Sequence, residues 1–206
     1  MNQWIVFDVM GVIFKVGDDT NDLLVPFVQE LDSNISRETV NDLYVAASLG
    51  EINSREFWEK LGFAKQYPEI EREYLDTRLT IDREFKDVAQ RLRERFCLGI
   101  LSNDVSEWSM YLQKKYRLDF FHAIVISGDV GYRKPDRKIY EILLQTVKAK
   151  PDNCIFVDDR CRNLIPAKKI GIKTIRFARE FEESEFRPDT EITSFKELEK
   201  AIEEVS

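Results

Sequence analysis

The chain alternates short apolar runs with segments of helical periodicity, and this alternation restricts the fold more than any other feature of the sequence. Continuous apolar runs of four or five residues are typical of strands that are buried on both faces. The segments between the later runs place apolar residues three and four positions apart, as on one face of a helix. Alternating strands and helices predict an α/β fold, a Rossmann-like open parallel sheet with helices on both faces. The expected strands are residues 4–7, 97–101, 123–126, 154–157 and 174–177.

A long segment between the first two runs breaks the alternation. Residues 16–84 carry apolar residues at helical spacing, such as Phe27 and Val28, and have little strand character. We therefore expect a helical cap inserted after the first strand, above the carboxyl edge of the sheet. The expected domains are a core formed by residues 1–15 and 85–206 and a cap formed by residues 16–84.

Composition and charge exclude several classes of protein. The chain has 31 Lys and Arg against 38 Asp and Glu, a net charge of −7. It is therefore a poor candidate for nucleic-acid binding, which needs neutralisation of phosphates. Its 3 widely spaced cysteines and single histidine do not fit a zinc motif. There is no apolar run of ~18 residues and no signal-peptide pattern at the N-terminus. We expect a cytoplasmic protein with no nucleic-acid or membrane partner and leave its oligomeric state open.

Polar residues follow four of the expected strands. In open α/β sheets, ligands bind beyond the carboxyl ends of the strands, so these residues are expected to meet at one edge. Lys134 lies in the loop SGDVGYRKPD after the third run, and the others follow the first, second and fourth runs directly. The set contains three carboxylates, a hydroxyl, an amide and an ammonium group: Asp8, Ser102, Asn103, Lys134, Asp158 and Asp159.

This set of groups matches what phosphoryl transfer needs. A carboxylate such as Asp8 can attack phosphorus and carry it as an acyl phosphate. Magnesium prefers oxygen ligands, and Asp8, Asp158 and Asp159 would supply them. The hydroxyl, the amide and the ammonium group would donate hydrogen bonds to the phosphoryl oxygens. Lys134 would also offset the repulsion between Asp8 and a dianionic substrate.

Taken singly, several of these residues have an ordinary structural interpretation. Asp8 can end a strand, Ser102 and Asn103 can form a helix-entry turn, and Lys134 can be a solvated loop lysine. The adjacent Asp158–Asp159 pair is different, because two neighbouring like charges are costly without a cation.

Three further polar residues near these segments have mainly structural interpretations. Arg133, next to Lys134, is expected on the surface. Asn163 is expected either to cap the helix after the fourth strand or to orient the loop before it. His122 precedes a strand, on the side of the sheet opposite the candidate site, and is not expected to be catalytic.

In order and position, the four polar segments resemble the four motifs of the haloacid dehalogenase-like hydrolase superfamily, over nearly the whole chain. The segments SGDVGYRKPDRKIYEILL and FVDDRCRNLIPAKKIGI are similar to the branch of sugar-phosphate phosphatases such as α-glucose-1-phosphate phosphatase. The phosphatase domain of soluble epoxide hydrolase is also similar. The resemblance implies Asp8 as nucleophile, Ser102, Asn103 and Lys134 as phosphate ligands, and a helical cap.

Met10 departs from the family pattern. Most phosphatases of the family have a second Asp two residues after the nucleophile, where it acts as general acid and base. Met cannot transfer a proton, but the resemblance implies that its backbone carbonyl still coordinates Mg²⁺. General acid/base assistance contributes ~10²–10⁴-fold to rate. The loss is expected to matter least for leaving groups that depart without protonation. Two alternatives for the missing proton donor stay open, substrate-assisted transfer and a residue of the cap.

Three functional hypotheses follow. The first is a Mg²⁺-dependent phosphatase that hydrolyses phosphate monoesters of a small metabolite, such as a sugar phosphate, through an aspartyl-phosphate intermediate. The second is a catalytically impaired relative, a binding or regulatory protein that binds phosphorylated ligands or a protein partner without turnover. The third is a metal-independent dehalogenase, which the paired carboxylates Asp158 and Asp159 disfavour.

Overall fold

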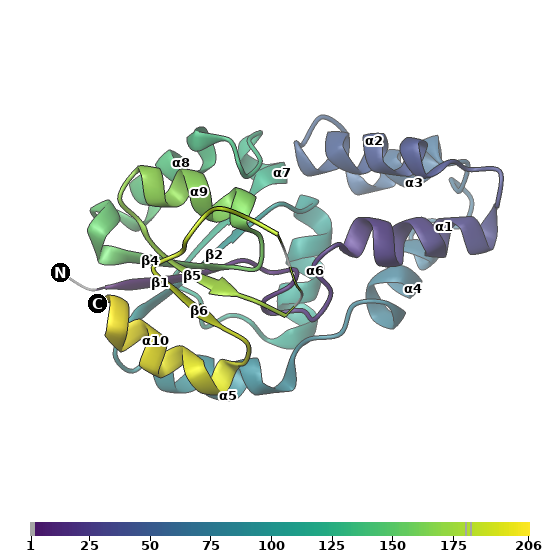
Figure 1. Ribbon diagram of the computed structural model, residues 1–206. Helices are drawn as coiled ribbons and strands as arrows, with labels where there is room; N and C mark the ends of the chain where they lie inside the picture. The colour runs from purple at the N-terminus through teal and green to yellow at the C-terminus, as the bar shows by residue number, and fades with distance from the viewer. Residues whose placement is uncertain (1–2, 180, 182) are drawn as a thin grey trace.

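A six-stranded parallel sheet organises the described part of the chain (Figure 1). The computed structural model describes residues 3–179, 181 and 183–206, so residues 1, 2, 180 and 182 of the expected core lie outside the described residues. The strand order is β3-β2-β1-β4-β5-β6, and every adjacent pair is parallel. The strands are β1 (Trp4–Phe7), β2 (Cys97–Ser102), β3 (Ala123–Ile126), β4 (Cys154–Asp158), β5 (Lys173–Phe177) and β6 (Thr190–Ile192).

The predicted fold class is confirmed, and the five expected strands form with shifts of at most one residue at either end. Strand β6 was not predicted, because its three residues, TEI at the sheet edge, form no apolar run. In the register of the sheet, Phe7 at the end of β1 pairs with Ile100 of β2 and Val157 of β4. The residues that follow these strands therefore reach the same edge.

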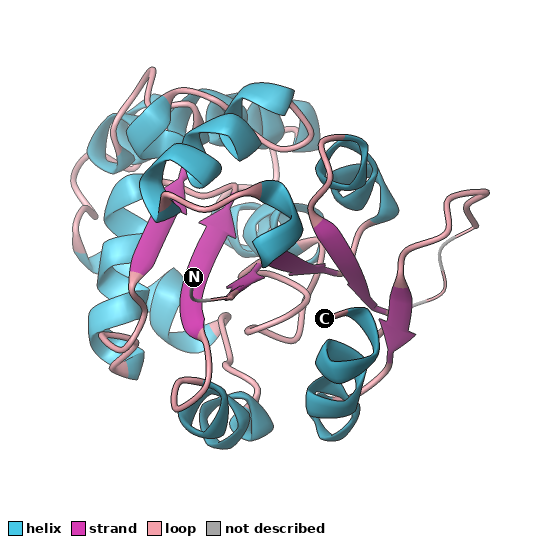
Figure 2. Cartoon of the chain, turned by 90° about the vertical axis from the view of Figure 1, so that its left-hand side faces the viewer, coloured by secondary structure: helices cyan, strands magenta, loops and turns pink. Residues whose placement is uncertain are grey.

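Helices cover both faces of the sheet (Figure 2). Alternate strand residues enter different apolar clusters, because successive side chains of a strand point to opposite faces. Phe7 joins the cluster that also contains apolar residues of α5, α6 and α10, whereas Val6 joins the cluster of α8 and α9. The helices and helical turns of the core are α5 (Arg83–Leu92), α6 (Ser106–Tyr116), α7 (Ser127–Val130), α8 (Arg137–Val147), η2 (Pro151–Asn153), α9 (Cys161–Lys169), η3 (Phe195–Glu197) and α10 (Leu198–Val205).

A helical segment between β1 and α5 lies at one end of the sheet (Figure 1). Isolated bridges pair Phe14 with Met10 and with Ile81, so the chain returns to the core beside the point where it left. The segment is hereafter the helical segment 20–77. It consists of η1 (Thr20–Leu24), α1 (Val25–Leu31), α2 (Arg37–Ser48), α3 (Ser54–Lys60) and α4 (Glu69–Thr77).

The helical segment 20–77 packs on α6 through aromatic side chains. Trp58 of α3 and Tyr74 of α4 lie 6.2 and 5.5 Å, centroid to centroid, from the ring of Trp108 in α6. The indole N–H groups of Trp58 and Trp108 both donate to Glu71 Oε2, at 3.1 and 2.8 Å. The segment and the core therefore share apolar and polar contacts. None of the described helices combines the length and apolar character needed to cross a membrane.

Candidate active site

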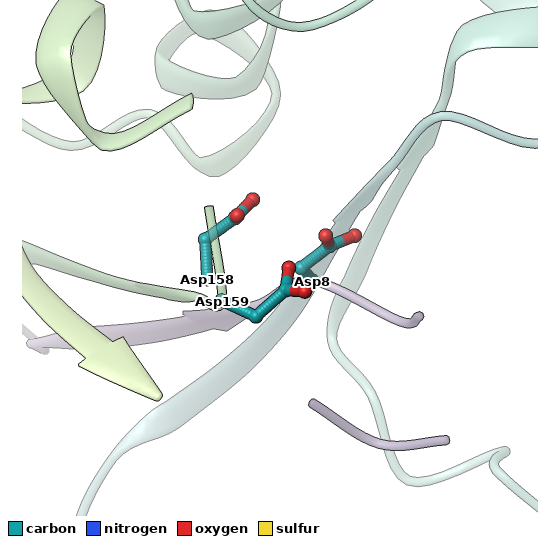
Figure 3. A group of neighbouring side chains, drawn as sticks. All are labelled: Asp8, Asp158 and Asp159. Carbon is teal, nitrogen blue, oxygen red and sulfur yellow. The ribbon is translucent and has the colours of Figure 1, made fainter. Parts of the chain in front are cut away.

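Three carboxylates meet at the carboxyl edge of the sheet (Figure 3). Asp8 follows β1, and its N–H donates to Val157 O at 2.8 Å, so the ladder between β1 and β4 fixes its position. Asp158 ends β4, and Asp159 follows it. One oxygen from each of Asp8, Asp158 and Asp159 lies within 4.8 Å of the others. Such a set of oxygen atoms suits a hard divalent cation.

Lys134 joins two of these carboxylates. Its Nζ lies 2.7 Å from Asp8 Oδ1 and 2.8 Å from Asp158 Oδ2, and only 1% of its side chain is exposed. Burial lowers the pKa of Lys134, but the charges of Asp158 and Asp8 outweigh this effect and raise it above its usual value. Burial raises the pKa of Asp8 to about 7, although the charge of Lys134 opposes the shift. Lys134 is therefore a fixed cation in the site.

Asp158 and Asp159 differ in how many hydrogen-bond and ion-pair partners their carboxylate oxygens have. Asp158 accepts hydrogen bonds from the N–H of Arg160 at 2.8 Å and from Asn163 Nδ2 at 3.1 and 3.0 Å, besides its ion pair with Lys134. Asp159 Oδ1 is buried and has no hydrogen-bond partner among the described residues. Burial, followed by the charges of Asp158 and Asp8, raises the pKa of Asp159 to about 8. The arrangement thus leaves Asp159 with the oxygen available to a cation.

Two glycines leave room for the carboxylate of Asp159. A Cβ atom at Gly11 or at Gly17 would come within 2.3 Å of Asp159 Oδ2. Gly11 also has a φ of +80°, which a residue with a side chain rarely adopts. The loop after β1 therefore approaches Asp159 through its backbone, next to Met10.

The two polar residues after β2 have different surroundings. Ser102 is 1% exposed, and its hydroxyl has no partner among the described residues. The side chain of Asn103 instead forms a reciprocal pair with the backbone of Lys134: Nδ2 donates to its carbonyl at 2.9 Å, and Oδ1 accepts from its N–H at 2.7 Å. The amide of Asn103 thus positions the Lys134 loop. The Ser102 hydroxyl stays without a partner among the described residues, and Ser102 is not among the residues that line the cavity over Asp8.

A cavity of about 310 Å³ opens over Asp8 between the core and the helical segment. Its core side includes the expected Asp8, Met10, Asn103 and Lys134, together with Arg133, Arg160, Arg162 and Asn163. Its other side is formed by residues that no sequence motif indicated: Gly17, Asp18, Asp19, Thr20, Asn21, Asn41, Tyr44 and Val45. Asp159 is not among the residues that line this cavity and lies instead on a neighbouring one of about 290 Å³.

The surface position expected for Arg133 is wrong. Arg133 is half-buried and lines the cavity. Its guanidinium carbon lies 5.3 Å from the ring centroid of Tyr44, and it donates a hydrogen bond to Ser48 Oγ. Tyr44 and Ser48 belong to α2, so the partners of Arg133 come from the helical segment. Nothing in the local sequence around Arg133 specifies these distant partners.

The haloacid dehalogenase-like hydrolase family model matches residues 3–171 of the chain. The match begins just before β1 and ends after α9, so it includes all four polar segments and the helical segment between them. The chain belongs to the haloacid dehalogenase-like hydrolases. The superfamily recognised from the four motifs is thereby confirmed.

A curated relative within this family is the glyceraldehyde 3-phosphate phosphatase of Methanopyrus kandleri. It is 31% identical over 133 residues, which cover 59% of this chain and 55% of the relative. The glyceraldehyde 3-phosphate phosphatase of Pyrococcus furiosus is 32% identical over 111 residues, covering 50% and 46%. The chain spans about half the length of these curated relatives.

Solved structures of the family share the fold at low sequence identity. The family enzyme of Bacteroides thetaiotaomicron, in complex with magnesium and inorganic phosphate, superimposes with a TM-score of 0.75 at 19% identity. The superposition covers 91% of this chain and 100% of that one. A 2-haloacid dehalogenase of Pseudomonas syringae gives a TM-score of 0.73 at 16% identity and covers 100% of both chains. Since a phosphate-bound enzyme and a dehalogenase fit equally well, this likeness establishes the fold alone.

Proposed function

We propose that the protein is a Mg²⁺-dependent hydrolase of phosphate monoesters that acts on a small phosphorylated metabolite. The observation that carries this proposal is the cluster of Asp8, Asp158 and Asp159, whose first two members pair with Lys134. Among the described residues, the Ser102 hydroxyl and Asp159 Oδ1 have no hydrogen-bond partner. Buried polar groups without partners are uncommon in folded proteins and suggest a missing ligand. Here one unpartnered atom suits a cation and the other suits a phosphoryl oxygen.

The cluster of three carboxylates, Asp8, Asp158 and Asp159, fits a magnesium ion. Asp8 and Asp159, with the backbone carbonyl of Met10, would hold the ion, and Asp158 would hold Lys134 in place and complete the set of oxygens. When bound, the ion neutralises charge on the phosphoryl oxygens and stabilises the ionised form of the carboxylates. This effect is needed, because burial and the neighbouring carboxylates raise the pKa of Asp8 to about 7 and that of Asp159 to about 8.

The residues of the chain provide the nucleophile and the hydrogen-bond donors for the phosphoryl group. The carboxylate of Asp8 attacks phosphorus and forms an aspartyl phosphate, which water then hydrolyses. Lys134 and Ser102 donate hydrogen bonds to the phosphoryl oxygens, together with the segment around Asn103. Asn103 itself keeps Lys134 aligned through the hydrogen bonds to its backbone.

The cavity favours a small hydrophilic substrate. Amide, carboxylate and guanidinium groups dominate its lining, among them Asn21, Asn41, Asp18, Arg133 and Arg160. Such groups suit the hydroxyl and carbonyl oxygens of a sugar or triose phosphate. The two curated relatives named glyceraldehyde 3-phosphate phosphatase agree with this size and polarity. We propose residues 16–84 as the cap domain that selects this substrate.

The test is hydrolysis of para-nitrophenyl phosphate by the purified protein, with Mg²⁺ or with EDTA, beside an Asp8→Asn variant. We expect turnover that needs Mg²⁺ and that falls by about 10⁴-fold or more in the variant, as when other enzymes lose their nucleophile. Turnover that persists in EDTA or in Asp8→Asn would refute the mechanism.

One observation favours a second candidate, a protein that binds phosphorylated ligands without turnover. Met10 stands where most phosphatases of the family carry their acid/base carboxylate. Under this alternative, Mg²⁺ and inorganic phosphate bind in calorimetry while no ester in a metabolite screen is hydrolysed.

A further inference from the structure

The proposed reaction needs a proton donor that Met10 cannot supply. The side chain of Met10 lines the cavity over Asp8 and is 6% exposed, but it has no group that can titrate. When phosphorus moves to Asp8, an alcohol leaving group departs as an alkoxide unless an acid protonates it. This assistance is worth ~10²–10⁴-fold in rate. On the proposed function, another group in the cavity must therefore replace the missing carboxylate.

Few titratable side chains line this cavity besides Asp8 and Lys134. Asp18 is engaged by Asn21, whose Nδ2 donates to both of its oxygens at 3.1 Å. Tyr44 donates its hydroxyl proton to Asn103 O at 3.2 Å, and burial raises its pKa well above the usual value, so it is a poor acid. Asp19 is 7% exposed and has no salt-bridge partner among the described residues. Asp19 is therefore the carboxylate of this lining that forms no ion pair among the described residues, whereas Asp8 pairs with Lys134 and Asp18 with Arg160.

The position of Asp19 suits the departing oxygen. In phosphoryl transfer, the attacking and leaving oxygens lie roughly in line on opposite sides of phosphorus. With Asp8 attacking from the core side, the leaving oxygen points across the cavity toward the helical segment. Asp19 directly precedes η1, the first helical turn of that segment, and contributes to that side of the lining. We propose that Asp19 is the general acid and general base of this active site.

The proton balance of the two steps is complete with Asp19 alone. In the first step the bond between Asp8 and phosphorus forms and the ester P–O bond breaks, while the Asp19 carboxyl gives its proton to the leaving oxygen. In the second step the Asp19 carboxylate takes a proton from water as the water oxygen attacks phosphorus. The bond to Asp8 then breaks, inorganic phosphate is released and Asp19 is again protonated.

The surroundings of Asp19 favour a carboxyl that can exchange protons near neutral pH. Burial raises its pKa to about 7, the charge of Asp18 adds to the shift, and Arg160 and Arg133 oppose it. Both protonation states are then populated near neutrality, as a group that acts first as acid and then as base requires. The other titratable groups that interact electrostatically with this carboxyl are Tyr44, Tyr74 and Asp104.

The experiment compares Asp19→Asn with the wild-type protein on para-nitrophenyl phosphate and on glycerol phosphate, both with Mg²⁺. For glycerol phosphate we expect kcat to fall by about 10²-fold or more, because the alkoxide is no longer protonated. For the aryl ester we expect a burst of about one equivalent of nitrophenol followed by slow turnover, because only hydrolysis of the aspartyl phosphate needs the base. The matched control is Asp22→Asn, an exposed carboxylate of η1, which should behave as wild type on both esters.

A second variant keeps the test decisive. Adding Met10→Asp to Asp19→Asn supplies a carboxyl at the usual position of the family, and we expect it to restore turnover of glycerol phosphate at least tenfold. Thermal unfolding and Mg²⁺ binding of each variant show whether the site has kept its structure.

Two results would overturn the role of Asp19. One is an Asp19→Asn variant that hydrolyses both esters at the wild-type ratio with no burst. The other, which needs no variant, is a wild-type rate that falls steeply with leaving-group basicity across substituted phenyl and alkyl phosphates, since no acid would then be acting. Failure of the proposed function looks different, because the wild-type protein would then show no Mg²⁺-dependent turnover that Asp8→Asn abolishes.

Discussion

The two sides of the active-site cavity use their charges in opposite ways. On the strand-end side, Lys134 Nζ forms ion pairs with Asp8 Oδ1 at 2.7 Å and with Asp158 Oδ2 at 2.8 Å. These pairs neutralise the charges and fix the three side chains before any ligand binds. On the helical side, Asp19 is buried without a salt bridge among the described residues, and Asn41 contributes an amide. This difference supports the proposed division of roles, in which the strand-end side holds the phosphoryl group and the helical side contacts the rest of the substrate.

The largest expected effect comes from Lys134→Met, which removes the cation that pairs with Asp8 and Asp158 on the strand-end side. Removing one partner from a buried ion pair costs about 3–5 kcal/mol of stability. The pKa of Asp8 should rise further, because the cation that opposes its upward shift is gone. We expect kcat to fall by about 10²–10³-fold, as when a preorganised donor is removed from an active site.

Activity assays and urea unfolding measure these two effects. Lys138→Met is the control, because Lys138 is 48% exposed and its ammonium group pairs, within the described part of the chain, only with Glu141 on the surface of α8 at 3.6 Å. Equal losses of stability in both variants would mean that Lys134 is not a compensating cation.

The next effect separates the two neighbouring carboxylates. Asp158→Asn removes the acceptor of the ion pair from Lys134 and should destabilise the fold. Asp159→Asn replaces a carboxylate whose Oδ1 has no partner among the described residues, so the metal-free protein should keep its stability or gain some. Its affinity for Mg²⁺ should nevertheless fall by at least about 10–100-fold, the range seen for residues that support a metal site.

Unfolding in EDTA and calorimetric titration with Mg²⁺ test this contrast. If Asp159→Asn binds Mg²⁺ as tightly as wild type while Asp158→Asn does not, the assignment of the cation to Asp159 is wrong.

The third prediction concerns pH. Burial raises the pKa values of Asp8 and Asp159 from 3.8 to about 7 and about 8, so between these limits the folded state binds more protons than the unfolded chain. The free energy of unfolding of the metal-free protein should therefore fall as pH rises from about 4 to about 8. Mg²⁺ binds the ionised carboxylates, so its stabilising effect should grow over the same range.

Chemical denaturation across this pH range, with EDTA or with Mg²⁺, measures both trends. The Asp159→Asn variant should show a shallower dependence in EDTA. A metal-free stability that rises with pH would contradict the buried, compensated arrangement of these carboxylates.

The comparison of the two sides also explains how much the sequence could predict. Asp8, Ser102 and Asp158 each follow an apolar run, and in a parallel sheet the ends of such runs meet at one edge. The position of these residues is therefore readable from the pattern of the chain. The helical segment was predicted from its periodicity and from the long interval between the first two strands.

For the helical side of the cavity, no pattern in the sequence indicated which residues line it. Asp19 precedes η1 and follows no apolar run of the sheet. Asn41 and Tyr44 reach the cavity because α2 docks against the loops after β2 and β3, and that docking depends on tertiary contacts. The hydrogen bond from Tyr44 to Asn103 O and the contacts of Arg133 with α2 are examples. The same limit applies to the pairing of the Asn103 amide with the backbone of Lys134, which joins two loops that lie far apart in the sequence.

The smallest expected effect distinguishes a hydroxyl kept for a ligand from one used by the fold. Ser102 and Ser127 are both buried, at 1% and 0% exposure. Ser127 Oγ accepts from the N–H of Asp104 at 3.0 Å, whereas Ser102 Oγ has no partner among the described residues. Ser127→Ala should cost about 1–3 kcal/mol, because a buried donor loses its acceptor. Ser102→Ala should leave the stability of the ligand-free protein unchanged and weaken inorganic phosphate binding with Mg²⁺ by several-fold. A loss of stability in Ser102→Ala with unchanged phosphate affinity would show that this hydroxyl serves the fold, and the strand-end side would then lose one of its proposed phosphate donors.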